Sequence, residues 1–109
     1  MLTINGNNIT LTRGDTLTLT VNITKDGEPY VPEQTDVIRF AVSKGYDGEI
    51  GYELIKSVVI PNDTLTFTLA SEDTKLAYRK YNYDVEVTHA DGCVDTFLSG
   101  TLTIAGEVK

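Results

Sequence analysis

The chain has 109 residues, of which 16 are acidic and 9 basic, so its formal net charge is −7. This length predicts a single domain over residues 1–109, and the negative charge argues against nucleic acid, whose phosphates a binding protein must neutralise. Thr, Val and Ile contribute 16, 10 and 8 residues against 5 Ala, a composition that favours strands over helices.

Alternating apolar and polar residues predict about seven strands. They cover residues 9–11, 17–24, 37–42, 52–60, 64–69, 81–88 and 94–104. In the third of them, Ile38, Phe40 and Val42 are expected to point inward. Residues 52–60 are apolar on both faces, so the sequence leaves the facing of that strand open.

Turn residues separate these strands. Asp91-Gly92 predicts a tight hairpin, because both residues tolerate the positive φ angles of primed turns. Residues 61–63 (Pro-Asn-Asp) are also expected to form a hairpin turn. Residues 25–36, which hold two prolines, are predicted to cross between sheets, and residues 44–51, with three glycines, to form a flexible loop.

The spacing of strands and turns is typical of an all-β fold, an antiparallel sandwich of two sheets, with an open barrel as the alternative. Residues 71–78 are expected to form a short helical turn, with Ser71 or Asp73 as its cap and Leu76 as its buried anchor. In immunoglobulin-like sandwiches, a tyrosine after such a corner bonds back to the chain, and Tyr81 and Tyr83 follow the turn here. We therefore predict an immunoglobulin-like sandwich.

Metal ligands are scarce. His89 and Cys93 flank the Asp-Gly turn and are the only His and Cys, too few for a zinc site. We expect a surface histidine and a small half-buried thiol. Calcium would be sought at residues 47–49 and 62–63, but neither has the acidic spacing of a calcium loop. We predict no metal and no cofactor.

Catalytic groups are equally scarce. A thiol at a hairpin tip lacks the cationic surroundings that would activate Cys93 as a nucleophile. Asp84 and Glu86 share one strand face that is expected to be solvated, so nothing should separate their pKa values. We predict that the protein is not an enzyme.

Aromatic residues are the candidates for an interaction surface. Phe97 falls on the polar side of its strand, so either it contacts a partner or a bulge near Gly100 returns it to the core. Tyr30, Tyr46 and Tyr52 lie in or beside the long loops, where tyrosine often serves recognition and also often just covers the fold. The threonines on the outward side of several strands are expected to reflect β-propensity.

The remaining signals concern location. The chain has no run of 18 apolar residues, so we predict no membrane insertion. Its first residues lack the basic and apolar regions of a secretion signal, and we expect no signal peptide. A single cysteine excludes an internal disulfide, which suits synthesis in a reducing cytosol.

Six segments follow one another in a characteristic order of strands and turns. They are Ile9-Thr10-Leu11-Thr12-Arg13-Gly14-Asp15-Thr16, Asp26-Gly27-Glu28-Pro29-Tyr30, Asp36-Val37-Ile38-Arg39-Phe40, Asp73-Thr74 with Ala77-Tyr78 and Tyr81-x-Tyr83-Asp84-Val85, Asp91-Gly92 with Asp95-Thr96-Phe97, and Gly100-Thr101-Leu102-Thr103-Ile104. This order resembles small proteins of phages and prophages of Gram-positive bacteria, and the N-terminal immunoglobulin-like domain of phage upper-baseplate proteins.

This resemblance implies a structural role without site residues. The expected partners are other phage tail or baseplate proteins, with self-association as a further option, and the expected location is the virion. Docking would use a sheet edge or the loops at one end. The alternative is a carbohydrate-binding or host-adhesion module that uses loop tyrosines.

Overall fold

A computed structural model describes residues 2–5, 7–22, 24–25 and 27–106. It is all-β, and a single 3₁₀ turn is the one helical element in the described ranges. The elements are β1 (Leu2–Asn5), β2 (Asn8–Thr12), β3 (Leu17–Thr20), β4 (Thr24–Lys25), β5 (Glu28–Pro29), β6 (Val37–Lys44), β7 (Glu53–Ile60), β8 (Thr66–Leu69), η1 (Ser71–Thr74), β9 (Arg79–Thr88) and β10 (Val94–Ala105). Within these ranges, no helix has the length and apolar character needed to span a membrane.

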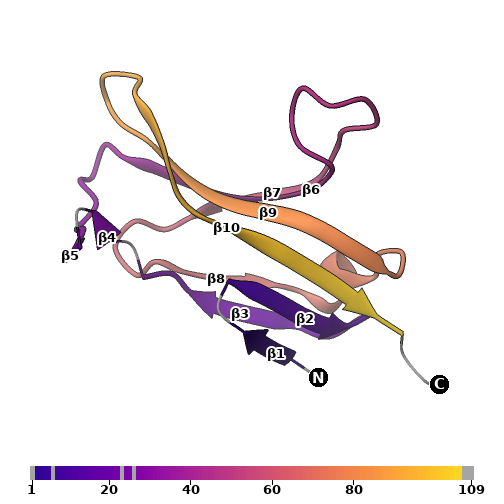
Figure 1. Ribbon diagram of the computed structural model, residues 1–109. Coiled ribbons are helices and arrows are strands. Elements are labelled where there is room, and N and C mark those ends of the chain that lie inside the picture. Colours follow the sequence, from indigo (N-terminus) through magenta and orange to yellow (C-terminus); the bar gives the residue numbers. More distant parts are fainter. Residues whose placement is uncertain (1, 6, 23, 26, 107–109) are drawn as a thin grey trace.

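Six strands form one sheet in the order β1-β2-β10-β9-β6-β7, and β3 pairs with β8 in a second sheet (Figure 1). A short β4–β5 pair stands apart. The prediction of purely antiparallel pairing is wrong at one position, because β2 and β10 run parallel. The other pairs are antiparallel.

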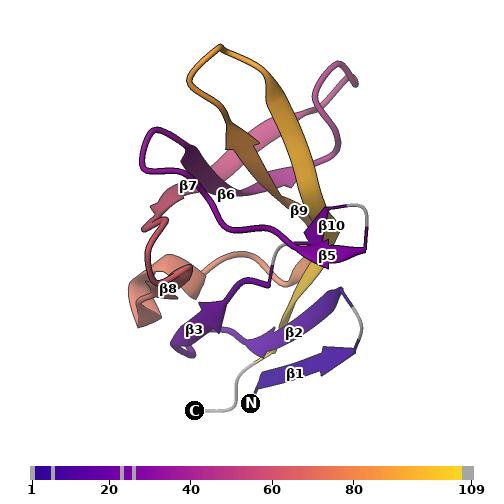
Figure 2. The ribbon, with the colours of Figure 1, turned by 90° about the vertical axis from the view of Figure 1, so that its left-hand side faces the viewer.

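The hydrophobic core lies between the six-stranded sheet and the β3–β8 pair, which form two layers in Figure 2. The ring of Phe40 on β6 lies 4.6 Å from that of Phe67 on β8 and 5.4 Å from that of Tyr83 on β9, so it joins both layers. Ile38, Phe40 and Val42 are all buried, as predicted. On the outside of the smaller sheet, the threonines pair by hydroxyl contacts, Thr18 with Thr68 and Thr20 with Thr66.

Two predicted strands are shorter than their alternation suggests. β3 ends at Thr20, and Ile23 lies outside the described residues. Leu65, expected within a strand, has a φ of +54°, and its N–H donates to the carbonyl of Pro61 (2.9 Å). The left-handed backbone conformation of Leu65 turns the chain before β8 begins. The Leu65 carbonyl accepts the N–H of Val21 (2.8 Å), which lies beyond the end of β3.

The prediction of a hairpin at residues 61–63 is wrong. The turn leads from β7 in the larger sheet to β8 in the smaller one, and these strands do not pair. Asn62 explains the geometry, because its side-chain amide donates to the carbonyls of Glu33 (2.9 Å), Gln34 (3.2 Å) and Asp36 (3.2 Å). The turn is therefore tied to the connection before β6, which was predicted to cross between the sheets and does so.

The β9–β10 hairpin is confirmed at Asp91-Gly92, but only Gly92 has a positive φ (+88°), so the turn does not have the positive φ at both residues that a type I′ turn requires. A β-bulge between Thr96 and Leu98 interrupts its register. The bulge reverses the facing of the strand, so Val94 is exposed whereas Leu98 packs against the core. The single facing predicted for residues 94–104 is wrong for this reason.

The predicted helical turn forms at Ser71–Thr74, with Leu76 packed against the core. Its N-cap is Ala70, not Ser71, and the carboxylate of Asp73 accepts the Ala70 N–H (3.1 Å). Beyond the turn, the Tyr81 hydroxyl donates to the carbonyl of Ala77 (2.9 Å). The predicted back-bonding tyrosine is therefore present.

Candidate functional site

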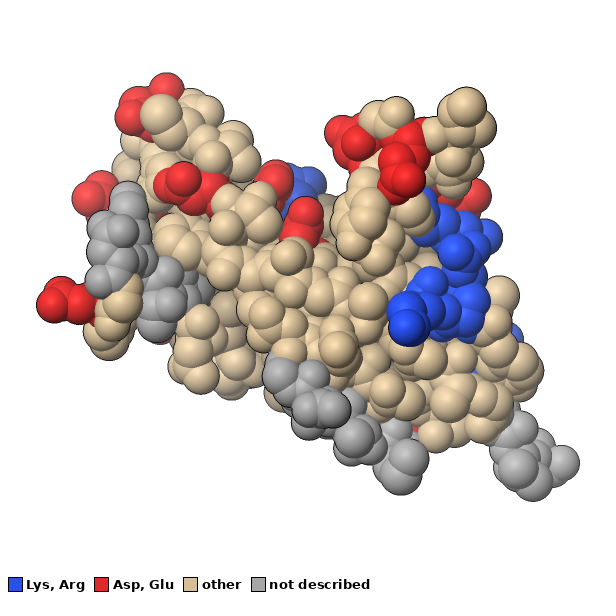
Figure 3. Space-filling model, in the orientation of Figure 1, with Lys and Arg blue, Asp and Glu red and all other residues tan. Residues whose placement is uncertain are grey.

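The outer face of the six-stranded sheet forms a hollow between two raised loops. The β9–β10 hairpin rises at one end and the β6–β7 loop at the other, on the side away from β3 and β8 (Figures 1 and 2). Figure 3 shows the notch between them, with acidic side chains on both loops. We call the outward side chains of its floor the saddle: Val94, Thr96, Ser99 and Thr101 on β10, Asn82, Asp84, Glu86 and Thr88 on β9, Val37, Arg39, Ala41 and Ser43 on β6, and Leu54, Ser57 and Val59 on β7.

The β6–β7 loop (residues 45–52) is shaped by its own hydrogen bonds. The Glu49 carboxylate accepts the N–H of Tyr46 (2.6 Å), and the Glu49 N–H donates to the Tyr46 carbonyl (3.0 Å). Gly45, Gly48 and Gly51 all have positive φ angles, which explains the three glycines of this loop. Glu49 is thus a structural residue of the turn that presents Tyr46.

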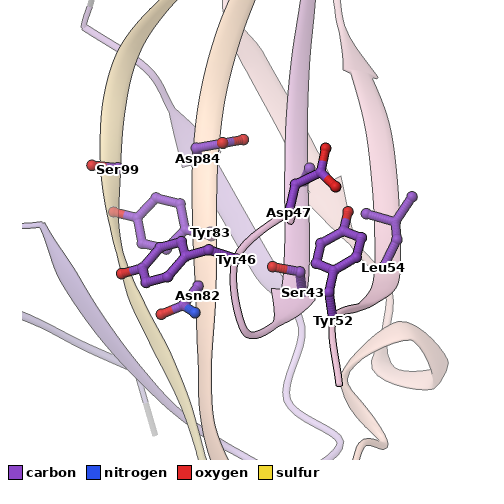
Figure 4. A pocket seen from close by; sticks show the side chains of 10 residues that line it. Ser43, Tyr46, Asp47, Tyr52, Leu54, Asn82, Tyr83, Asp84 and Ser99 are labelled. Carbon is purple, nitrogen blue, oxygen red and sulfur yellow. The ribbon is translucent and has the colours of Figure 1, made fainter. Parts of the chain in front are cut away.

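A pocket of about 110 Å³ lies where this loop meets the saddle. Its floor consists of small and polar side chains, and its wall comes from the loop and the start of β7. The floor residues are Ala41, Ser43, Asn82, Asp84 and Ser99, and the wall residues are Tyr46, Asp47, Tyr52 and Leu54. Figure 4 shows the Tyr46 ring on one side and Tyr52 with Asp47 on the other.

Asp84 is the charged group of the pocket floor. Burial raises the pKa of its carboxyl, and the nearby charge of Glu86 raises it further. No hydrogen bond reaches this carboxylate from any residue within the described ranges. The strand face that carries Asp84 and Glu86 was expected to be solvated. At Asp84 it is partly desolvated, because the β6–β7 loop lies over this residue.

A second polar cluster ties the β9–β10 hairpin to the segment before β6. Asp36, only 6% exposed, accepts hydrogen bonds from the Tyr30 hydroxyl (2.7 Å) and the Glu33 N–H (2.9 Å). The His89 ring lies between two carboxylates, with Nδ1 3.0 Å from Asp36 Oδ1 and Nε2 2.8 Å from Asp95 Oδ2. These residues, with Asp91 and Cys93, line an open hollow on the surface.

The cluster holds His89 in its charged form. Since both ring nitrogens face carboxylate oxygens, only the imidazolium can donate to both. The hydrogen bond to Asp95, then that to Asp36, raises the pKa of His89. The Tyr30 hydroxyl bond is the main cause that lowers the pKa of Asp36, and the same bond raises the pKa of Tyr30 to about 12.

Raising the pH is expected to remove the stabilisation that His89 supplies. Its folded pKa lies above the ordinary 6.5, so its contribution is complete below pH 6.5 and is lost as the pH rises through the folded pKa. Asp36 has the opposite sign, since its pKa lies below 3.8 and its contribution is lost on acidification. We expect the melting temperature of the wild type to exceed that of His89→Gln at pH 6, by a margin that shrinks towards pH 9. A margin independent of pH would contradict a charged His89.

The four predicted interaction residues form two separate pairs. Tyr46 and Tyr52 flank the pocket of the saddle. Tyr30 and Phe97 stack on each other with ring centroids 5.3 Å apart, and both pack against the core. Of the two interpretations of Phe97, the structure shows the bulge that turns it towards the core, but the bulge lies between Thr96 and Leu98 and not near Gly100.

The predictions for His89 and Cys93 are wrong. His89 is half-buried and ion-paired rather than a plain surface residue, because Asp36 and Asp95 converge on it. Cys93 is exposed rather than half-buried, because it sits at the open end of the hairpin. A hydrogen bond with Asp91 raises the pKa of its thiol, which disfavours the nucleophilic thiolate.

Neither suggested calcium position gathers ligands. Within the described ranges, no three His, Cys, Asp or Glu side chains come together in a way that would hold a metal ion. At residues 47–49, the Glu49 carboxylate bonds the loop backbone, and at residues 62–63, the Asn62 amide binds carbonyl groups.

Comparison with known proteins gives no assignment. No protein-family model matches the chain, and no curated protein matches it. The function is therefore argued from the geometry of the saddle and from the resemblance in strand and turn order.

Proposed function

We propose that the protein is a non-catalytic structural module of a phage or prophage virion, which docks tail or baseplate components through protein–protein contacts. The observation that carries this proposal is the saddle, an uncovered sheet face between two raised loops (Figure 3). A concave sheet face of this kind suits a protein surface better than a small substrate.

Apolar side chains in and beside the saddle support this role. Leu54 is 52% exposed and Val59 is 59% exposed, both on β7. Val37 on β6 and Val94 on β10 are also exposed on the same face of the sheet. The β6–β7 loop adds the fully exposed Ile50. Exposed apolar residues grouped on one face are typical of interaction sites.

The position of β7 adds a second means of docking. It ends the six-stranded sheet, so one side of its backbone has no strand partner within the described residues. A free edge of eight residues can pair with an extended segment of another chain. The saddle and this edge are continuous, since Leu54 and Val59 belong to both.

We further propose that the fold is an immunoglobulin-like sandwich. The order β10-β9-β6-β7 corresponds to strands G, F, C and C′ of that fold, and the β3–β8 pair to strands B and E. The hydrogen bond from Tyr81 to Ala77 matches the tyrosine corner at the start of strand F. Both features support the resemblance to the N-terminal domain of upper-baseplate proteins.

Co-expression with the products of neighbouring genes, followed by size-exclusion chromatography, tests the proposed function. We expect one tail or baseplate product to co-elute with the protein. Val59→Arg in the saddle should weaken that complex at least about tenfold, as for a residue central to an interface. Thr68→Arg, on the exposed face of β8, is the matched control and should leave it unchanged. Failure of every neighbouring product to bind, or equal binding by both variants, would refute the proposal.

A carbohydrate-binding or host-adhesion module is the second candidate. Tyr46 and Tyr52 flank a pocket whose floor carries Ser43, Asn82 and Ser99, a combination of aromatic and hydrogen-bonding groups that sugars use. Binding to a glycan array that disappears in Tyr46→Ala or Tyr52→Ala would favour this candidate over docking.

A further inference from the structure

We propose that the pocket of the saddle binds the guanidinium group of an arginine side chain presented by the docking partner. This inference rests on the proposed function and deepens it, because it names the chemical group that the saddle receives. Three properties of the pocket carry it: its size, its aromatic walls and its unpartnered carboxylate.

The size of the pocket suits a single side-chain head group. A volume of about 110 Å³ holds only about three or four water molecules. The floor is low because Ala41, Ser43 and Ser99 are small, and the walls stand above it on the β6–β7 loop. A long side chain that reaches in from above would place its end group on this floor.

The walls suit a flat cation. The rings of Tyr46 and Tyr52 lie on opposite sides of the pocket (Figure 4). Aromatic faces attract cations through the ring quadrupole, and the planar guanidinium also stacks on them. Tyr46 is 64% exposed, so more than half of its surface is left for a ligand to cover.

The floor supplies the counter-charge. The carboxylate of Asp84 is half-buried and makes no hydrogen bond with a described residue, and burial raises the pKa of its carboxyl, so it is partly desolvated and its remaining partner is solvent. Asp47 on the wall is a second carboxylate at the same pocket. A guanidinium presents several N–H donors in one plane and can pair with a carboxylate through two of them.

Charge favours arginine over a sugar as the occupant. The chain carries a net charge of −7, and acidic side chains stand on both loops that frame the saddle (Figure 3). The net negative charge attracts cations, although Arg39 lies in the saddle and Figure 3 also shows basic side chains below the β6–β7 loop. Sugar hydroxyls can donate hydrogen bonds to Asp84, but a neutral glycan would leave its negative charge without a counter-charge.

Nuclear magnetic resonance with ¹⁵N-labelled protein tests the pocket without any partner. The probe is N-acetyl-arginine amide, and N-acetyl-citrulline amide, its neutral isostere, is the matched control. We expect the arginine probe to shift the amide signals of Ser43, Tyr46 and Asn82, and the citrulline probe to bind much more weakly. Equal binding of the two probes, or shifts outside the pocket only, would overturn the proposal, as would tighter binding of methyl glycosides at these residues.

Substitutions separate the charge from the shape of the pocket. Asp84→Asn should weaken the arginine probe about tenfold, the size of a lost hydrogen bond to a charged group. Tyr46→Ala should weaken it about threefold, as for an exposed cation–π contact. Glu72→Gln, exposed on η1 outside the saddle, is the control and should bind as the wild type does. Unchanged affinity in Asp84→Asn, with native far-ultraviolet circular dichroism, would overturn the proposal.

The outcomes distinguish this inference from the proposed function. If a neighbouring gene product co-elutes but neither Asp84→Asn nor the arginine probe has an effect, the arginine pocket is refuted and docking stands. If the probe binds at the pocket but no partner is found, the pocket stands and the docking role is refuted.

Discussion

Phe40→Ala is expected to lower the free energy of unfolding by about 3–5 kcal/mol. Phe40 is fully buried on β6, and its ring contacts those of Phe67 and Tyr83. Removing the ring leaves a cavity at the point where the two sheets meet, and the rigid strands on either side cannot close it. Domains of this size are stable by only about 5–15 kcal/mol, so the variant should be close to unfolding.

Urea denaturation followed by far-ultraviolet circular dichroism measures this loss. Phe40→Leu should cost less, because leucine fills part of the space. Val37→Ala on the same strand, at an exposed position, should change stability by less than about 0.5 kcal/mol. A Phe40→Ala variant as stable as Val37→Ala would show that the two sheets do not depend on this contact.

Local alternation was enough to predict most strands and their inward residues. It succeeded where a strand has one buried face throughout, as in β6 and β9. It failed where a single residue changes the geometry: the positive φ of Leu65 delays the start of β8, and the bulge at Phe97 reverses the facing of β10. The turn at Leu65 has no local sequence signal, whereas the place of Phe97 on the polar side of its strand was a signal for the bulge.

The pairing of strands was harder to predict than their existence. Residues 61–63 have the composition of a hairpin turn, yet the side chain of Asn62 binds carbonyl groups about thirty residues earlier in the chain. The parallel β2–β10 pair joins the two ends of the described chain. Such long-range contacts decide the sheet order, and a single sequence does not display them.

The candidate sites also divide into residues with a local sequence signal and residues that only the fold brings together. Tyr46 and Tyr52, which flank the pocket, could be singled out from the sequence because they stand in or beside a glycine-rich loop. Asp84 was not, since its burial requires that this loop folds over the outer face of β9. The ion pairs of His89 were missed because its partners, Asp36 and Asp95, come from other segments and converge only in the fold. The acidic residues near His89 in the sequence were the one signal for these ion pairs, and acidic residues are common in this chain.

Gly100→Ala is expected to destabilise the protein by about 2–3 kcal/mol, because β10 passes too close to the turn before β2 for any side chain. A Cβ at Gly100 would lie 2.1 Å from the carbonyl oxygen of Asn7, which is a backbone atom and cannot rotate away. The same oxygen accepts the hydroxyl of Tyr83, so moving it also breaks a hydrogen bond to a buried side chain. Gly106→Ala is the matched control, since a Cβ there meets only the Tyr78 ring at 3.9 Å. Chemical denaturation of both variants tests this close approach, which equal stability of the two would contradict.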